Sequence, residues 1–218
     1  MKKPYQVSKQ ALQRMPYYLN YLKTTCKGKM ENVSARMIAD ALGLNEVQVR
    51  KDLAAVSVAG GKPKTGFPVD ALVTDIETFL GYDNVNRAVL VGAGRLGKAL
   101  MTYNGFENYG LEIIAAFDNA PAVMGTMLNG KEILGIDRLQ EICALYNVHI
   151  GIITVPVSVA QTACDALIDA GVEAIWNFAP THLEVPEGIL VQNENMASSL
   201  AVLSSHLAHK MKEEMEEA

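Results

Sequence analysis

Apolar residues in the first eighty positions recur every three or four residues, in short stretches separated by polar residues and glycines. This spacing predicts helices over residues 8–25, 33–43, 45–56 and 70–80, each with one apolar face. Gly43 stands in the tight turn between the second and third of these helices. Two short helices joined in this way are typical of a helix-turn-helix unit.

Residues with strong positional preferences support these boundaries. Ser34 suits the N-cap of the second helix, and Asn45, with Gln48 three residues later, has the spacing of a capping box for the third. Pro16 lies inside the first predicted helix and has no backbone N–H, so we expect it to kink or split that helix.

A segment rich in glycine, proline and lysine separates the third predicted helix from the fourth. Its composition, over residues 60–69, predicts an exposed loop, which we interpret as the wing of a winged helix-turn-helix domain. Gly81 ends the fourth helix, and residues 81–86 are expected to be a linker.

From residue 87 the pattern changes to short apolar runs that alternate with helical stretches. Such alternation predicts a parallel sheet with helices on both faces. The predicted strands are 87–91, 111–117, 148–155, 172–178 and 188–191, with helices at 137–147 and 158–170. A last helix is predicted over about 197–217, where an apolar stripe requires something to pack on: Leu200, Leu203, Leu207, Met211 and Met215.

Charge is distributed unevenly between the two halves of the chain. Residues 1–64 carry twelve Lys and Arg against four Asp and Glu, whereas residues 65–218 carry seven against twenty. The net charges, +8 and −13, sum to the −5 of the whole chain. A basic end on an acidic protein favours contact with a polyanion, although a solvated basic face is the alternative.

Basic side chains on the third predicted helix point to double-stranded DNA as that polyanion. This helix is the one that enters the major groove in helix-turn-helix proteins, and arginine there can pair with guanine. Lysines of the wing suit flanking phosphates. The expected DNA-contacting residues are Ser34, Gln48, Arg50, Lys51, Lys62 and Lys64. A winged helix used for protein contacts is the alternative.

A glycine-rich turn follows the first predicted strand. Gly92-Ala93-Gly94-Arg95-Leu96-Gly97 is a full G-x-G-x-x-G that opens a helix, and Asp118 lies 21 residues after Gly97, at the end of the next strand. This combination predicts a dinucleotide site in which the glycines admit a pyrophosphate and the carboxylate binds the adenosine ribose. Asp118 would repel a 2′-phosphate, which favours NAD over NADP. A domain of this type that binds something else, or nothing, is the alternative.

The fold class that follows is α/β. We expect a winged helix-turn-helix domain at residues 1–80, a Rossmann-type parallel sheet domain at 81–195 and a dimerisation helix at 196–218. Thr154-Val155-Pro156 and Asn177-Phe178 follow two parallel strands, on the rim where ligands bind, and are expected to line a nicotinamide pocket. Ordinary loop chemistry is the other interpretation of both segments.

Composition argues against several other classes. No run of eighteen apolar residues predicts a membrane span, and the start of the chain lacks an apolar signal core, so we expect a cytoplasmic protein. Three distant cysteines form no Cys-x-x-Cys and fit reduced thiols. The four histidines form no evident catalytic pair, and we expect neither a metal site nor catalytic residues.

With these motifs in order, the chain resembles the Rex family of redox-sensing transcriptional repressors. The resemblance spans nearly the whole length. It is carried by Arg14-Met15-Pro16-Tyr17-Tyr18, Gln48-Val49-Arg50-Lys51-Asp52-Leu53, the Gly92–Gly97 turn, Phe117-Asp118, Thr154-Val155-Pro156, Ala160-Gln161, Asn177-Phe178-Ala179-Pro180 and the terminal helix.

The resemblance implies a homodimer whose terminal helix swaps into the partner, and repression of genes for NADH-consuming pathways until NADH releases the protein from operator DNA. It also implies that Tyr103 senses the redox state of the nicotinamide. The chain departs from the family pattern at Ala54–Ser57 and in a longer, more basic wing. Asn20 and Asn195 replace an arginine and an aspartate that form an ion pair in the family, and Met196 replaces a phenylalanine.

These observations lead to a mechanistic hypothesis. An apolar pocket with side chains such as Val155 and Phe178 should prefer the neutral ring of NADH over the charged ring of NAD+, because burying an unpaired charge is costly. If the NADH-bound dimer closes, its two recognition helices no longer match half-sites one helical turn, or a multiple, apart.

Three other functions stay open at this stage. A small NAD-dependent dehydrogenase would need an acid or base near the nicotinamide, and Tyr5-x-x-x-Lys9 lies before the first strand, in the wrong domain. A CoA-binding module shares this kind of sheet and similar strand-end prolines. The third is a related DNA-binding protein whose redox coupling is weakened, as the changes at Asn20 and Asn195 suggest.

Overall fold

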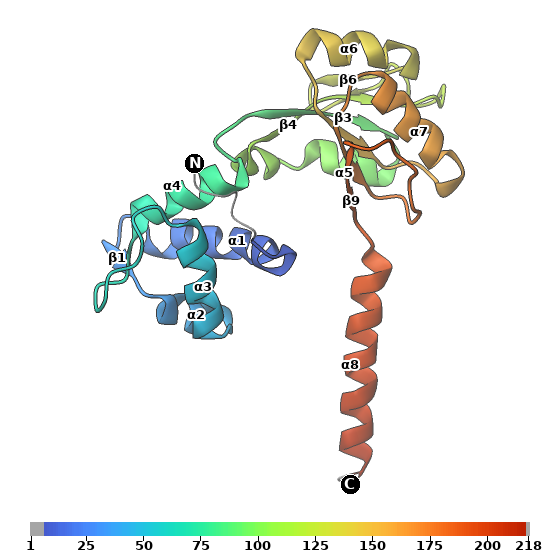
Figure 1. Ribbon diagram of the computed structural model, residues 1–218. Coiled ribbons are helices and arrows are strands. Elements are labelled where there is room, and N and C mark those ends of the chain that lie inside the picture. The colour runs from blue at the N-terminus through green and yellow to red at the C-terminus, as the bar shows by residue number, and fades with distance from the viewer. Residues whose placement is uncertain (1–6, 217–218) are drawn as a thin grey trace. The chain divides into compact units, whose positions relative to one another are not determined.

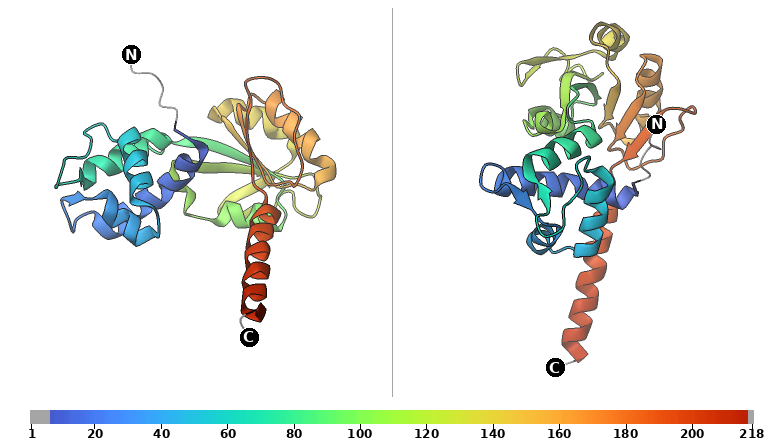
Figure 2. Two further views of the ribbon diagram at one scale, coloured as in Figure 1. Left: turned by 60° about the horizontal axis from the view of Figure 1, so that its bottom comes forward. Right: turned by 60° about the vertical axis from the view of Figure 1, so that its left-hand side comes forward.

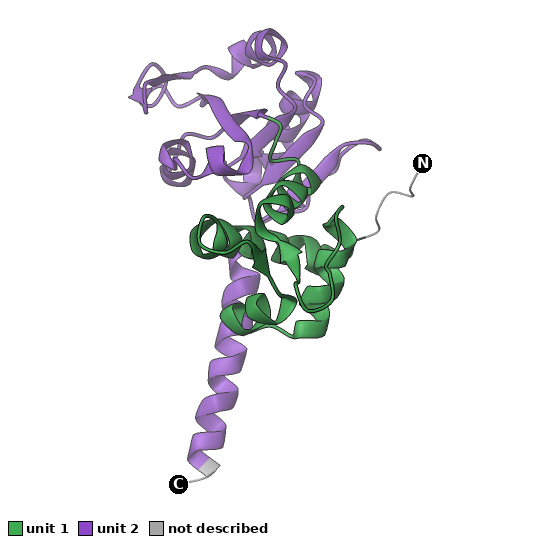
Figure 3. Ribbon diagram, turned by 90° about the vertical axis from the view of Figure 1, so that its left-hand side faces the viewer, with its two compact units in different colours: residues 1–84 green, residues 85–218 purple. Residues whose placement is uncertain are grey.

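The computed structural model of this chain describes residues 7–216 and contains two compact units, 1–84 and 85–218 (Figure 3). The division between them falls inside the segment 81–86, which the sequence predicts to be a linker. Each unit has its own hydrophobic core.

Unit 1 is a small helical domain with one short two-stranded sheet. Ser34 Oγ accepts a hydrogen bond from Met37 N at 3.1 Å, and Asn45 Oδ1 accepts from the amides of Val47 and Gln48 at 2.9 and 3.2 Å. Both predicted N-caps are therefore confirmed. The elements are α1 (Lys9–Tyr21), the π-helical turn η1 (Leu22–Cys26), β1 (Asn32–Val33), α2 (Ala35–Leu42), α3 (Glu46–Val56), β2 (Phe67–Pro68) and α4 (Val69–Leu80).

Pro16 does not split the first helix. α1 runs without interruption from Lys9 to Tyr21, and η1 continues it to Cys26. Met15, Tyr18 and Leu19 are buried in the core of unit 1. Packing of this face outweighs the one backbone hydrogen bond that proline removes.

The end of the wing belongs to a sheet that the sequence did not predict. β1 and β2 pair antiparallel, with Val33 opposite Phe67, and Lys62 forms an isolated bridge with Gly66 within the loop. Strands of two residues are too short to show an alternating pattern. Of the exposed loop expected over residues 60–69, residues 60–66 form a loop between α3 and β2, whereas Phe67–Pro68 is β2 and Val69 begins α4, with Phe67 and Val69 buried.

Unit 2 is built on a seven-stranded sheet in the order β5-β6-β4-β3-β7-β8-β9, parallel except for the antiparallel pair β5–β6. All five predicted strands are present, but the short pair β5–β6 was missed. The elements are β3 (Asn86–Val91), α5 (Arg95–Thr102), η2 (Phe106–Tyr109), β4 (Leu111–Phe117), β5 (Met127–Leu128), β6 (Lys131–Leu134), η3 (Ile136–Arg138), α6 (Leu139–Tyr146), β7 (Ile150–Ile153), α7 (Val157–Asp169), β8 (Ala174–Asn177), β9 (Leu190–Asn193) and α8 (Met196–Glu216).

Helices cover the two faces of this sheet unequally. α6 and α7 pack over one face, against residues such as Val89 and Val91, while α5 packs over the other, against Ala88 and Leu90 (Figures 1 and 2). Successive residues of β3 point to opposite faces and are buried on both, as expected for a central parallel strand.

The last helix, α8, is exposed along its whole length. Every one of its described side chains, residues 196–215, is exposed, including an apolar set: Met196, Leu200, Val202, Leu203, Leu207, Met211 and Met215. None of the helices in the described part of the chain is both long and apolar enough to cross a membrane. The described residues also contain no cluster of metal-ligating side chains.

Candidate functional site

A cleft in unit 2 opens where the order of the strands reverses. β3 lies between β4 and β7, so successive connections from the middle of the sheet run in opposite directions. Ligands of open α/β sheets bind beyond the carboxyl ends of the strands at such a switch point. The segments starting at Gly92 and Thr154 follow β3 and β7, so the fold brings the two sequence motifs together here.

The glycines of the turn after β3 are required by close backbone contacts. A Cβ atom on Gly97 would lie 2.1 Å from the carbonyl oxygen of Gly92, and Gly92 itself has φ +101° with Thr154 and Val155 packed against it. Gly94 differs, because no atom lies within 4 Å of the position of its Cβ. The first and third glycines therefore shape the turn, and the second faces open space where a pyrophosphate can approach.

Two side chains hold this turn in place by bonding to its backbone. Thr154 Oγ1 donates a hydrogen bond to Gly92 O at 2.6 Å. The Asp118 carboxylate accepts one from Ala93 N and one from Ala120 N, each at 2.8 Å. A carboxylate can accept about four hydrogen bonds, so Asp118 retains capacity for ribose hydroxyls. The sequence did not reveal these supporting roles, because no motif encodes the contact between Thr154 and Gly92.

The cleft has a volume of about 440 Å³ and is mainly apolar away from the turn. Its lining residues are Val91, Gly92, Gly94, Asp118, Asn119, Ile136, Thr154, Val155, Pro156, Val159, Thr162, Ala163 and Ala166. Sequence reasoning did not assign seven of these residues to the site: Val91, Asn119, Ile136 of η3, and Val159, Thr162, Ala163 and Ala166 of α7. Arg95 and Leu96 begin α5 at the edge of the cleft, where the free N–H groups of a helix favour an anion.

Tyr103 and Phe178 belong to a row of aromatic rings and do not line this cleft. Tyr103 contacts Phe106, Phe106 contacts Trp176, and Trp176 contacts Phe178, with ring centroids 4.9, 5.6 and 4.9 Å apart. The row lies on the face of the sheet that carries α5, and the Tyr103 side chain is 56% exposed.

Asn177 ends β8 and bonds to the turn that follows it. Its side chain is fully buried, donates to Ala179 O, Thr181 O and Asn193 Oδ1, and accepts from Ala179 N. An amide used in this way holds the turn after β8 and ties it to β9. These bonds give Asn177 a structural role, and its contact with a cofactor stays a prediction.

In unit 1, a basic groove lies between α2, α3 and the wing. It has a volume of about 530 Å³ and brings together Ser34, Arg50, Lys62 and Lys64, four of the six residues expected to contact DNA. Arg36 and Glu46 also line it, and sequence reasoning missed both. In the sequence, only their positions in the first turns of α2 and α3 could have indicated that they line the groove.

The two remaining candidates, Gln48 and Lys51, lie on α3 outside this groove. Lys51 is exposed. Gln48 is also exposed, but its side-chain Nε2 donates to Asp52 Oδ1 at 2.8 Å. Arg50 donates to Glu46 Oε1 one helical turn earlier. On α3, Gln48 and Arg50 are each therefore held by a partner one helical turn away.

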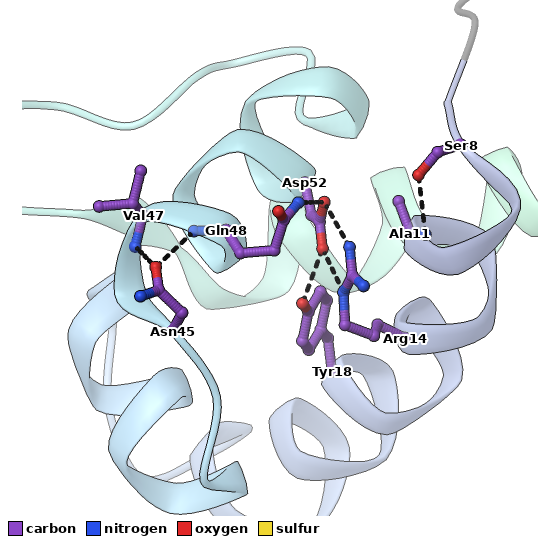
Figure 4. Close-up of polar contacts among 8 residues, drawn as sticks. All are labelled: Ser8, Ala11, Arg14, Tyr18, Asn45, Val47, Gln48 and Asp52. Atoms are coloured by element: carbon purple, nitrogen blue, oxygen red, sulfur yellow. Dashed lines mark hydrogen bonds and ion pairs between the residues drawn. The ribbon is translucent and has the colours of Figure 1, made fainter.

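A buried polar network fastens α3 to α1 (Figure 4). Arg14 donates to both oxygens of Asp52, at 2.8 and 3.1 Å, and the Tyr18 hydroxyl donates to Asp52 Oδ2 at 2.8 Å. Burial alone would raise the pKa of Asp52, but the hydrogen bonds from Arg14, Tyr18 and Gln48 hold that pKa below its ordinary value. Burial, followed by the bond to Asp52, raises the pKa of Tyr18 to about 12.

Comparison with known proteins assigns the chain to a family. Residues 6–54 match the family described as putative DNA-binding protein N-terminus, and residues 83–181 match the CoA binding domain family. The redox-sensing transcriptional repressor Rex of Bacteroides fragilis is 40% identical over 92% of this chain and 91% of its own. The chain belongs to the Rex family of redox-sensing transcriptional repressors.

Solved Rex structures share the whole fold. RSP, a Rex-family repressor, in complex with β-NAD+ and operator DNA, has a TM-score of 0.85 and 30% identity, covering 96% of this chain and 97% of its own. RSP in complex with β-NADH has a TM-score of 0.83 and 29% identity, covering 97% and 99%. The expected fold class is therefore confirmed.

The two asparagines that depart from the Rex pattern have local partners here. Asn195 Oδ1 accepts from Ser198 N at 3.1 Å, at the start of α8. Asn20 is exposed, and its main-chain carbonyl accepts from the Thr24 hydroxyl at 2.8 Å. Asn195 thus has a capping role that is independent of any charged partner.

Proposed function

We propose that this protein is a redox-sensing transcriptional repressor that binds operator DNA through unit 1 and NAD(H) through the cleft of unit 2. NADH binding releases it from DNA, so the NADH/NAD+ ratio controls transcription. One observation carries this proposal: the chain combines a winged helix that has a basic groove with a parallel sheet whose glycine turn lies at the switch point.

The cleft supports a dinucleotide on geometric grounds. Gly94 leaves open space where the backbone can approach a pyrophosphate, while Asp118 lines the cavity near the turn. The carboxylate suits two ribose hydroxyls and disfavours a phosphate at that ribose. When bound, the nicotinamide carries the redox state, because its oxidised ring is charged and its reduced ring is neutral. Tyr103 and Phe178 lie outside the cleft, and we infer that they meet the nicotinamide end of the cofactor where it extends beyond the cleft.

The basic groove supports duplex DNA as the ligand of unit 1. Arg36, Arg50, Lys62 and Lys64 line one continuous depression, and Lys51 is exposed nearby on the same helix. α3 is the second helix of the helix-turn-helix unit, which enters the major groove in such proteins. RSP, the Rex-family repressor of similar structure, was crystallised with operator DNA.

We further propose that the protein acts as a homodimer. The apolar side chains of α8, among them Leu200, Leu203 and Leu207, are more than half exposed, and a face of this kind requires a partner. A second copy supplies that partner and sets the spacing of two recognition helices. Sedimentation of the wild-type chain and of Leu203→Glu tests this: we expect a dimer that the charged variant dissociates. Identical sedimentation as monomers would contradict it.

The central experiment titrates operator DNA with the purified protein at several NADH/NAD+ ratios and constant total nicotinamide. We expect NADH to weaken DNA binding at least tenfold more than NAD+ does, which corresponds to about 1.4 kcal/mol of coupling. Asp118→Ala should remove most of this difference while DNA binding in the absence of cofactor is kept. Equal effects of the two cofactors would refute redox sensing and leave DNA binding intact.

The match of residues 83–181 to the CoA binding domain family favours CoA as a second candidate ligand. CoA carries a 3′-phosphate on the ribose that Asp118 would contact, and two negative groups there repel each other. Competition settles the point: we expect excess CoA to leave NADH binding unchanged. Displacement of NADH by CoA at similar concentrations would favour CoA as the ligand of the cleft.

A further inference from the structure

Glu46 is an acidic residue in a groove otherwise suited to a polyanion. It is the first residue of α3 and lines the groove together with Arg36, Arg50, Lys62 and Lys64. Among the described residues that line this groove, it is the only carboxylate. A negative charge here opposes the approach of phosphates, so its position calls for a reason.

Glu46 is paired with Arg50, the residue best placed to read a base. The two are four residues apart on α3, and Arg50 Nη2 donates to Glu46 Oε1. The side chain of Arg50 is 63% exposed and that of Glu46 38%, so both remain accessible to a ligand in the groove. Glu46 thus fixes the direction of the guanidinium before DNA arrives.

Helix stability alone does not require this arrangement. An exposed ion pair at this spacing contributes little, and Asn45 already caps the helix by accepting from the amides of Val47 and Gln48. Arg36 and Asp40 form a comparable exposed pair on α2, but Asp40 does not line the groove. Glu46 is the acid that a DNA duplex in the groove would meet.

We propose that Glu46 is a specificity-determining residue, which makes α3 select a site containing a G·C pair at the cost of general affinity for DNA. The inference rests on the proposed binding of duplex DNA by unit 1. At the correct site, Arg50 donates to guanine O6 and N7, and Glu46 accepts from the 4-amino group of cytosine. Elsewhere, Glu46 faces phosphates or acceptor edges, is left unpaired, and weakens the complex.

The test compares Glu46→Gln with Asp40→Asn, which removes the same charge from an ion pair of the same spacing outside the groove. Wild-type protein first selects its operator from a random pool of duplexes. The affinities of the three proteins for that operator and for a random duplex are then measured. We expect Glu46→Gln to bind the random duplex about tenfold more tightly and to lose at least tenfold in operator preference. Asp40→Asn should change both affinities equally.

A second measurement locates the base that is read. Each cytosine of the selected operator is replaced in turn by an analogue that lacks the 4-amino group. At one position, wild-type protein should lose about tenfold in affinity and Glu46→Gln should lose little. Glu46→Asp, which keeps the charge but shortens the reach, should bind random DNA as weakly as wild type does and lose the response to the analogue.

The outcomes separate the two proposals. If wild-type protein selects an operator but Glu46→Gln behaves like Asp40→Asn, the role of Glu46 is overturned and DNA binding stands. If no cytosine analogue distinguishes wild type from Glu46→Gln, readout of cytosine is overturned. If wild-type protein selects no duplex at all, the proposed function of unit 1 fails first.

Discussion

The two candidate sites are held in shape by different kinds of contact. In unit 2 the glycine turn is fixed through its backbone. Gly97 approaches Gly92 O closely, Ala93 N donates to the Asp118 carboxylate, and Gly92 O accepts from the Thr154 hydroxyl. In unit 1 the recognition helix is fixed through side chains that converge on Asp52.

This difference determines how each site responds to mutation. A backbone-held turn has almost no tolerance for an added atom where the chain approaches itself, but it accepts many side chains around it. A network of buried side chains depends on every member, because losing one leaves the others desolvated and unpaired. The predictions below test this contrast, from the largest expected effect to the smallest.

Asp52→Ala should lower the stability of unit 1 by about 3 to 5 kcal/mol, because it leaves Arg14 and Tyr18 without their shared partner. Hydrogen exchange of the α1 and α3 amides at neutral pH measures this loss. Unit 2 should be unaffected, which urea unfolding can follow through Trp176, the only tryptophan of the chain.

The matched control for this prediction is Asp40→Ala, which breaks an exposed pair with Arg36. It should cost no more than about 0.5 kcal/mol. Similar losses for the two variants would mean that burial of Asp52 confers no special importance, and the contrast between the two units would be lost.

Gly97→Ala should destabilise unit 2 by roughly 2 to 4 kcal/mol and abolish measurable NADH binding, because its Cβ would lie 2.1 Å from a backbone oxygen. Trp176 fluorescence in urea and NADH titration measure the two effects. Gly94→Ala adds the same methyl group where the protein leaves space, so its stability should be unchanged while its NADH affinity falls. If Gly97→Ala is as stable as the wild-type protein, the backbone of the turn can shift to admit the methyl group, and the prediction is wrong.

Unit 1 should lose stability as the pH rises from about 10 to 12. The pKa of Tyr18 is raised to about 12, whereas an unfolded tyrosine loses its proton near pH 10. Below pH 10 the contribution is fully present. Above it, the unfolded state releases its proton first, and up to about 3 kcal/mol is lost across the window.

Tyrosinate absorbance and far-UV circular dichroism, followed against pH, check this expectation. Tyr18→Phe should remove a tyrosine whose titration is shifted toward pH 12 and flatten the loss of stability in this window. Tyr17→Phe alters an exposed neighbour and should retain both features. A wild-type chain in which all tyrosines titrate together near pH 10 would argue against burial of the Tyr18 hydroxyl.

Lys62→Ala should have the smallest effect, a loss of roughly threefold in affinity that is equal for operator and random DNA. The slope of log affinity against log salt concentration should become shallower by about one, since one phosphate contact is lost. Lys62 lines the groove on the wing, and we expect it to meet phosphates and not bases. Lys27→Ala, an exposed lysine of unit 1 outside the groove, serves as the control and should change neither quantity. A loss confined to the operator would assign Lys62 to base reading.

Local patterns in the sequence determined the elements and the main chemistry of the cleft. The spacing of Gly92, Gly94 and Gly97 after an apolar run, with Asp118 beyond, encodes a turn whose requirement is conformational and therefore local. Ser34, Asn45 and Gly81 marked helix ends for the same reason, since caps depend on neighbouring residues.

Only the tertiary structure decided which distant groups meet. Nothing local places Arg14 and Tyr18 on Asp52, 38 and 34 residues away, or the Thr154 hydroxyl on Gly92. The same holds for Asn177, whose buried amide bonds to Asn193 of β9, and for Pro16, whose helix survives because its apolar face is packed. Long-range packing energies exceed local preferences at these positions, and a single sequence does not display them.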